Sequence, residues 1–243
     1  MAPVSRLVLV SAALLTLAAT TTPAASGQRG QMNSKTTIVA MGDSTTAGTP
    51  GWKSRVEAPP EGAGDVTSQY AYWLMQAHPD WRVLNMGVNG ERSDEIRARF
   101  ERDVIAHTPA VVVVIAGVND VYQGRPAQHV MDELDKMYRR AAAARIAVVA
   151  GSIIPYNTAT AEQNTRMRQI NAWIQQRAGQ GSNLAFVDTR AAAAKADDID
   201  QLFESPDGLH PSAAGYRRMA EAIRPILENL VHGEGRSGQQ GHR

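Results

Sequence analysis

Two short segments far apart in the chain contain the residue types of a hydrolytic nucleophile. Ser44 lies in Gly42-Asp43-Ser44-Thr45, at the end of an apolar run, and the second segment, Asp207-Gly208-Leu209-His210-Pro211, opens a helical stretch. A serine hydroxyl is a weak nucleophile until a histidine takes its proton and a carboxylate orients that histidine. The segments predict Ser44 as nucleophile, His210 as base and Asp207 as the residue that orients the base. The alternative is a helix-capping serine and a surface turn without function.

Two further segments predict donors for a negatively charged transition state. Gly90 ends Asn85-Met86-Gly87-Val88-Asn89-Gly90, and Asn119 lies in Gly117-Val118-Asn119-Asp120. Acyl transfer places negative charge on an oxygen atom, which fixed N–H groups stabilise. A glycine permits close approach of its backbone, and an asparagine side chain donates without carrying charge. We therefore expect Gly90 and Asn119, with the backbone N–H of Ser44, to form an oxyanion hole; the alternatives are a turn glycine and a helix cap.

The chain alternates apolar runs with helical stretches, which predicts an α/β fold with a doubly wound parallel sheet. Ser44, Gly90 and Asn119 each follow a different predicted strand. Open α/β sheets bind ligands at the carboxyl ends of their strands, so these residues are expected to converge in one crevice. The predicted strands are 36–41, 81–86, 110–116, 146–154 and 184–187, and the predicted helices are 68–77, 93–106, 126–144, 161–178 and 212–230.

The four segments together resemble the four sequence blocks of the SGNH, or GDSL, hydrolase superfamily, in the family's order. The resemblance spans roughly residues 36–230. It implies a single-domain, three-layer α/β/α, flavodoxin-like fold with a five-stranded parallel sheet of order 2-1-3-4-5. It also implies the site roles described above. Thr45 stands where the family often has leucine, which bears on the subfamily more than on the mechanism. The Gly-x-Ser-x-Gly signal of α/β-hydrolases is absent from the sequence.

The ends of the chain predict segments outside the catalytic domain. Arg6, an uncharged apolar run over 7–19 and the small residues that follow predict a secretory signal peptide at 1–26, a linker at 27–35 and a secreted or periplasmic protein. The run is shorter than the about 20 residues of a membrane span, so no stable anchor is expected after signal removal; a retained anchor is the alternative. The hydrolase domain is predicted at 36–231 and a disordered tail at 232–243.

Composition excludes several classes of function. The sequence has no cysteine, which removes thiolate catalysis and sulfur-ligated metals, and its 6 histidines show no spacing typical of a metal site. No cofactor or metal is therefore expected. Because Arg6 is the only charged residue before Gly27, the remaining chain carries 24 Lys plus Arg against 24 Asp plus Glu. This balance argues against a nucleic-acid or anionic-membrane partner.

The expected activity is that of an exported serine esterase acting on small-molecule or polysaccharide-borne esters. Export and an uncharged domain favour short-chain acyl or O-acetyl esters over charged thioesters. The alternatives are an acyltransferase that uses the same site and a catalytically silent carbohydrate-binding protein of the same fold. Segment 49–67 is long for a loop and is either a lid or substrate wall or a mobile insertion. Pocket-lining and packing roles are equally open for four aromatic residues, Trp52, Tyr70, Tyr122 and Tyr156.

Overall fold

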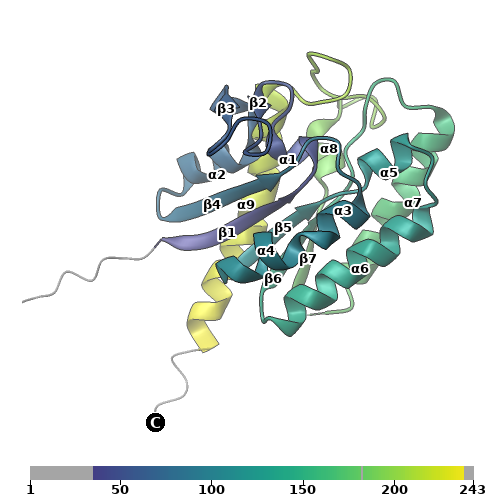
Figure 1. The fold of residues 1–243 in the computed structure, drawn as a ribbon. Helices are drawn as coiled ribbons and strands as arrows, with labels where there is room; N and C mark the ends of the chain where they lie inside the picture. The colour runs from purple at the N-terminus through teal and green to yellow at the C-terminus, as the bar shows by residue number, and fades with distance from the viewer. Residues whose placement is uncertain (1–34, 182, 238–243) are drawn as a thin grey trace, which may run out of the picture. The chain divides into compact units, whose positions relative to one another are not determined.

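A five-stranded, fully parallel sheet forms the centre of the protein in a computed structural model that describes residues 35–181 and 183–237. These residues fall in one compact unit. The predicted signal peptide and all of the predicted linker but Lys35 lie outside the described residues. The spatial order of the strands is β4 (Trp81–Gly87), β1 (Thr36–Gly42), β5 (Val111–Ile115), β6 (Ala147–Gly151) and β7 (Leu184–Val187) (Figure 1). The predicted 2-1-3-4-5 topology is confirmed.

Helices cover both faces of this sheet, as Figure 1 shows, which confirms the three-layer α/β/α architecture. The short helices α1 (Ser44–Ala47) and α5 (Val118–Tyr122) follow β1 and β5 at the carboxyl end of the sheet. None of the described helices has the length and apolar character needed to cross a bilayer. One face carries α2 (Tyr70–Ala77), α8 (Thr189–Ala193) and α9 (Ala213–Ser237), and the other carries α3 (Ser93–Ala98), α4 (Phe100–Asp103), α6 (Ala127–Ala143) and α7 (Ala161–Ala178).

The central strands form because their side chains are apolar on both faces. In a strand, successive side chains point to opposite faces. Val112 and Val114 of β5 accordingly pack into the core under α6 and α7, while Val111 and Val113 pack into the core under α2 and α9. All residues of β5 and β6 are buried. This double burial explains why the strands are continuous valine and alanine runs rather than alternating ones.

Several predicted boundaries differ from the structure. The predicted helix 93–106 is divided into α3, α4 and the 3₁₀ turn Ile105–His107, because the backbone of Arg99 leaves helical values where its side chain enters the protein. Strand β6 ends at Gly151, the last residue paired with β7. Helix α9 continues to Ser237. It therefore runs into the first residues, 232–237, of the segment predicted as a tail at 232–243. Residues 238–243 lie outside the described residues.

The long segment 49–67 contains regular structure that the sequence did not predict. Its strands β2 (Trp52–Lys53) and β3 (Ala63–Gly64) pair antiparallel, and the 3₁₀ turn Val66–Ser68 leads into α2. Glu57 accepts a hydrogen bond from the Asn89 side chain at 3.2 Å, which ties the segment to the loop after β4. Strands of two residues each are too short to leave a periodic pattern in the sequence.

Candidate active site

Ser44 is the first residue of α1 (Ser44–Ala47), which begins directly beyond β1. Asp43 caps this helix by accepting a hydrogen bond from the Thr45 backbone N–H at 2.9 Å, which organises the turn. Close packing of α1 on the sheet requires glycine at two positions. A Cβ on Gly87 would lie 2.1 Å from the Ala47 nitrogen, and one on Gly42 would lie 2.3 Å from the Ile115 oxygen. These glycines allow the Ser44 turn to rest on the strand ends.

Three of the five predicted site residues form a continuous hydrogen-bonded chain. His210 Nε2 lies 2.9 Å from Ser44 Oγ, and His210 Nδ1 lies 2.7 Å from Asp207 Oδ2. An ionised carboxylate only accepts hydrogen bonds, so Nδ1 carries the ring proton and Nε2 offers its lone pair to the Ser44 hydroxyl. The Ser44 residue is 4% exposed, and the His210 side chain 13%. This arrangement can move a proton from the serine to the histidine without rearrangement.

The turn between α8 and α9 fixes Asp207 and His210. Asp207 Oδ1 accepts hydrogen bonds from the backbone N–H groups of Leu209 at 2.9 Å and His210 at 2.8 Å, which leaves Oδ2 for the imidazole. Burial alone would raise the pKa of Asp207. The bonds from the His210 ring and these two backbone groups outweigh that effect and hold this pKa below its usual value. The carboxylate therefore stays ionised at neutral pH.

Asn119 and Gly90 lie on the loops that flank Ser44. Asn119 belongs to α5 (Val118–Tyr122), beyond β5, and one hydrogen of its side-chain amide goes to the Glu91 carbonyl at 2.9 Å. The second hydrogen of that amide remains for another acceptor. Gly90 has φ of 81°, a conformation that side chains disfavour, although a Cβ there would meet no atom within 4 Å. Backbone conformation rather than space therefore selects glycine at this position.

Buried charged side chains hold the loop that contains Gly90. Asp120 accepts hydrogen bonds from the Ser93 N–H at 2.8 Å and the Ser93 hydroxyl at 2.9 Å. Arg99 donates to Glu91 Oε2 at 2.6 Å, and it also donates to the carbonyls of Gly42 at 2.8 Å and Met86 at 2.7 Å. Its guanidinium thus connects the ends of β1 and β4 with the residue after Gly90. Sequence reasoning did not single out Arg99, because its partners lie in other segments.

A pocket of about 200 Å³ opens beside the Ser44 hydroxyl. Ser44, Asn119 and His210 line the pocket. Gly90 is not among the lining residues, although its neighbour Asn89 is. Of the four aromatic candidates, Tyr122 and Tyr156 line the pocket, while Tyr70 is fully buried in the core and Trp52 lies in β2. No residue of segment 49–67 is among the lining residues. The pocket therefore does not support a substrate-wall role for that segment. The lining residues that sequence reasoning missed are Thr45, Asn89, Val118 and Leu209.

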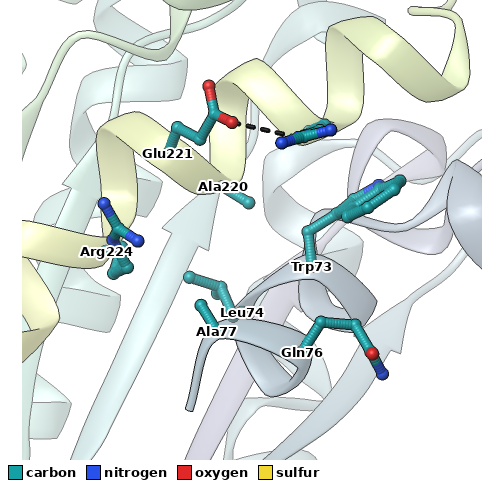
Figure 2. A pocket seen from close by; sticks show the side chains of 8 residues that line it. Trp73, Leu74, Gln76, Ala77, Ala220, Glu221 and Arg224 are labelled. Atoms are coloured by element: carbon teal, nitrogen blue, oxygen red, sulfur yellow. Dashed lines mark hydrogen bonds and ion pairs between the residues drawn. The ribbon is translucent and has the colours of Figure 1, made fainter.

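A second hollow, of about 270 Å³, lies between α2 and α9 and contains none of the predicted site residues. Figure 2 shows its wall, where Trp73 faces the ion pair that Glu221 forms with Arg217 at 3.0 Å. Neither a serine nor a histidine lines it. The proton-transfer geometry described above is therefore specific to the pocket beside Ser44.

One group of described side chains has the ligand types of a metal site. The ligand atoms of Asp94, Asp120 and His129 all lie within 4.8 Å of one another. The Asp120 carboxylate is fully buried and both of its oxygens are bonded to Ser93. The group belongs to the scaffold behind the Gly90 loop and does not border the pocket.

Comparisons of this chain with known proteins agree on one family. The model of the GDSL-like Lipase/Acylhydrolase family matches residues 40–218. An acetylxylan esterase from Geobacillus stearothermophilus is 30% identical over 188 residues, which cover 68% of this chain and 85% of that protein. A structure of a catalytic mutant of an acetylxylan esterase from the same organism has a TM-score of 0.62 at 25% identity and covers 81% of this chain and 94% of that chain.

A G-D-S-L lipolytic protein from Veillonella parvula has a TM-score of 0.64 at 21% identity, over 79% of this chain and 98% of that chain, a likeness of fold alone. The matching family model covers most of the domain, from within β1 to within α9, including the segments that carry Ser44, Asn119 and His210. The chain therefore belongs to the GDSL-like lipase/acylhydrolase family and is a carboxylic ester hydrolase.

Proposed function

We propose that this enzyme hydrolyses short-chain acyl esters, above all O-acetyl groups on neutral saccharides, through an acyl-enzyme on Ser44. The observation that carries the proposal is the unbroken hydrogen-bonded chain from Ser44 through His210 to Asp207 at the edge of a small pocket. Such a chain supplies a nucleophile, a base and an orienting carboxylate in one place.

In the first half of the reaction, Ser44 Oγ attacks the ester carbonyl carbon while its proton passes to His210 Nε2. The carbonyl oxygen gains negative charge and accepts hydrogen bonds from the backbone N–H groups of Ser44 and Gly90 and from the free amide hydrogen of Asn119. The bond to the alcohol oxygen then breaks, and that oxygen takes the proton from His210. The acyl group remains on Ser44.

The second half of the reaction uses the same groups in the same order. Water gives a proton to His210 Nε2 as its oxygen attacks the acyl carbon. Collapse of this intermediate breaks the bond to Ser44 Oγ, which recovers the proton from His210, and the carboxylic acid leaves. Asp207 stays ionised and stabilises the imidazolium in both halves.

The pocket supports a short acyl group and a neutral substrate. Its volume of about 200 Å³ is below the roughly 300–1,000 Å³ of common ligand pockets. Its lining residues include no lysine, arginine, aspartate or glutamate. The relative of 30% identity acts on acetylxylan by its name, which agrees with a small acyl group on a neutral sugar. A polymeric substrate also agrees with export through the predicted signal at 1–26; N-terminal sequencing of protein recovered outside the cytoplasm tests that step.

The proposal is tested by Ser44→Ala and Asp207→Asn assayed on ethyl acetate and on acetylated xylo-oligosaccharides. Ser44→Ala should lose turnover and labelling by a fluorophosphonate, because both need the hydroxyl. Asp207→Asn should lower kcat about 10²–10⁴-fold, because an amide favours the wrong imidazole tautomer and cannot stabilise the imidazolium. Both variants should keep the thermal unfolding midpoint of the wild type within a few degrees. Undiminished hydrolysis by Ser44→Ala would refute the assignment.

A further inference from the structure

Tyr122 is an exposed aromatic side chain at the mouth of the pocket beside Ser44. It is 59% exposed, although large apolar residues in the described part of the chain are mostly buried. It is the last residue of α5, three positions after Asn119, so both side chains lie on neighbouring positions of one helical face. The ring thus borders the place where the ester must lie.

The Tyr122 ring is held in place from behind. Tyr156, which is 2% exposed, meets it edge to face, with ring centroids 5.9 Å apart at an angle of 63°. Edge-to-face pairs of this kind are favourable beyond their buried area. A supported ring loses little conformational entropy when a ligand covers it, which is the property of a preformed binding surface.

A second exposed apolar side chain lies on the other wall of the pocket. Leu209, which is 38% exposed, precedes His210 and lines the same pocket. Tyr122 shares a helix with Asn119, Leu209 is the chain neighbour of His210, and both are exposed at the same pocket. Because the cavity of about 200 Å³ has room for a small acyl group, the alcohol part of the substrate must lie at this mouth, against these side chains.

The chemistry of the mouth selects a particular kind of alcohol. A pyranose ring has a flat face of C–H groups that can cover an aromatic ring, and its hydroxyl groups remain in water. No permanently charged side chain lines the pocket, so the mouth offers nothing to an ionic leaving group. From these contacts, and resting on the proposed function, we infer that Tyr122 is a specificity-determining residue that stacks on the pyranose ring of the leaving alcohol.

The test compares a ring-bearing with a ring-free acetyl ester. For Tyr122→Ala, we expect KM for acetylated xylo-oligosaccharides to rise about tenfold, the factor that corresponds to about 1.4 kcal/mol, and KM for ethyl acetate to rise by a clearly smaller factor, because ethyl acetate has no pyranose ring to stack. Tyr122→Phe keeps the ring and should keep the wild-type KM. Phe203→Ala is the matched control, because Phe203 is an aromatic residue, 39% exposed, that does not line the pocket. Phe203→Ala should change KM for neither substrate more than twofold.

Several results would overturn the inference while leaving Ser44 as nucleophile. They are an unchanged KM of Tyr122→Ala for the saccharide, an equal loss on both esters, or a loss in Tyr122→Phe as large as that in Tyr122→Ala. A second measurement uses unacetylated xylotriose as a competitive inhibitor of ethyl acetate hydrolysis. It should inhibit the wild type about tenfold more strongly than Tyr122→Ala. Failure of the proposed function is separate, since it would appear as ethyl acetate hydrolysis by Ser44→Ala.

Discussion

Arg99 should contribute strongly to stability because it is a buried charge that connects several segments. Its side chain is 7% exposed and donates to the carbonyls of Gly42 and Met86 and to the carboxylates of Glu91 and Asp103. Arg99→Met keeps an unbranched apolar stem but removes all of these donors. The substitution therefore tests the loss of the charge and its hydrogen bonds more than a change in side-chain volume.

The expected loss follows from what each partner can find afterwards. Removing one member of a buried ion pair costs about 3–5 kcal/mol. Asp103 keeps two hydrogen bonds from Arg102, at 2.6 and 3.0 Å, and the Gly42 carbonyl keeps the Val88 N–H at 3.1 Å. The Glu91 side chain is 21% exposed and can regain water. We therefore expect Arg99→Met to lower the free energy of unfolding by about 3 kcal/mol, the low end of that range.

Urea unfolding followed by circular dichroism measures this loss, with the slope of the transition as a check on two-state behaviour. Arg102→Met is the matched control, because Arg102 contacts the same Asp103 but is 73% exposed; a surface pair should cost less than about 1 kcal/mol. Arg99→Lys should fall between the two, since an ammonium cannot reach both carbonyls at once. Equal losses in Arg99→Met and Arg102→Met would refute the reasoning.

Two other perturbations test the turns around Ser44. Complete burial raises the pKa of Asp43 to about 7. The folded state therefore binds more protons than the unfolded chain between about pH 4 and 7. The contribution of Asp43 to the free energy of unfolding falls as pH rises through that window. Asp43→Asn should remove that fall, seen as a smaller drop in the urea midpoint from pH 4 to pH 8 than in the wild type; an equal drop would contradict the burial argument. Gly90→Ala should cost only about 1 kcal/mol of backbone strain, because its Cβ meets open space. Gly87→Ala should disturb α1 and lower kcat more than Gly90→Ala does, because its Cβ would lie 2.1 Å from the Ala47 nitrogen.

Local patterns were sufficient to predict the sheet and most of the helices. The strands are apolar runs buried on both faces. Helix α7 begins at the predicted residue, 161, where the Thr160 side chain caps it by accepting a hydrogen bond from the Gln163 N–H. The end of β6 could not be predicted, since Ile153 and Ile154 continue the apolar run beyond Ser152. There the backbone of Ile153 bonds to the Asn171 side chain instead of a neighbouring strand, at 2.7 and 2.9 Å.

In the candidate site, too, some features follow from the local sequence and others from contacts between distant segments. Ser44 and Asn119 could be assigned to one crevice because each follows a strand end, and the register places Gly42 beside both Gly87 and Ile115. Gly90, predicted in the same crevice, is not among the lining residues. The Arg99 connection and the exposure of Tyr122 depend on contacts between segments that no local pattern records. Arg99 occupies a position that the helical period assigns to solvent as readily as to the core, and its inward orientation depends on hydrogen bonds to the strand-end carbonyls of Gly42 and Met86. The reaction class could therefore be predicted from the sequence, while the inference about the leaving alcohol rests on contacts of this second kind.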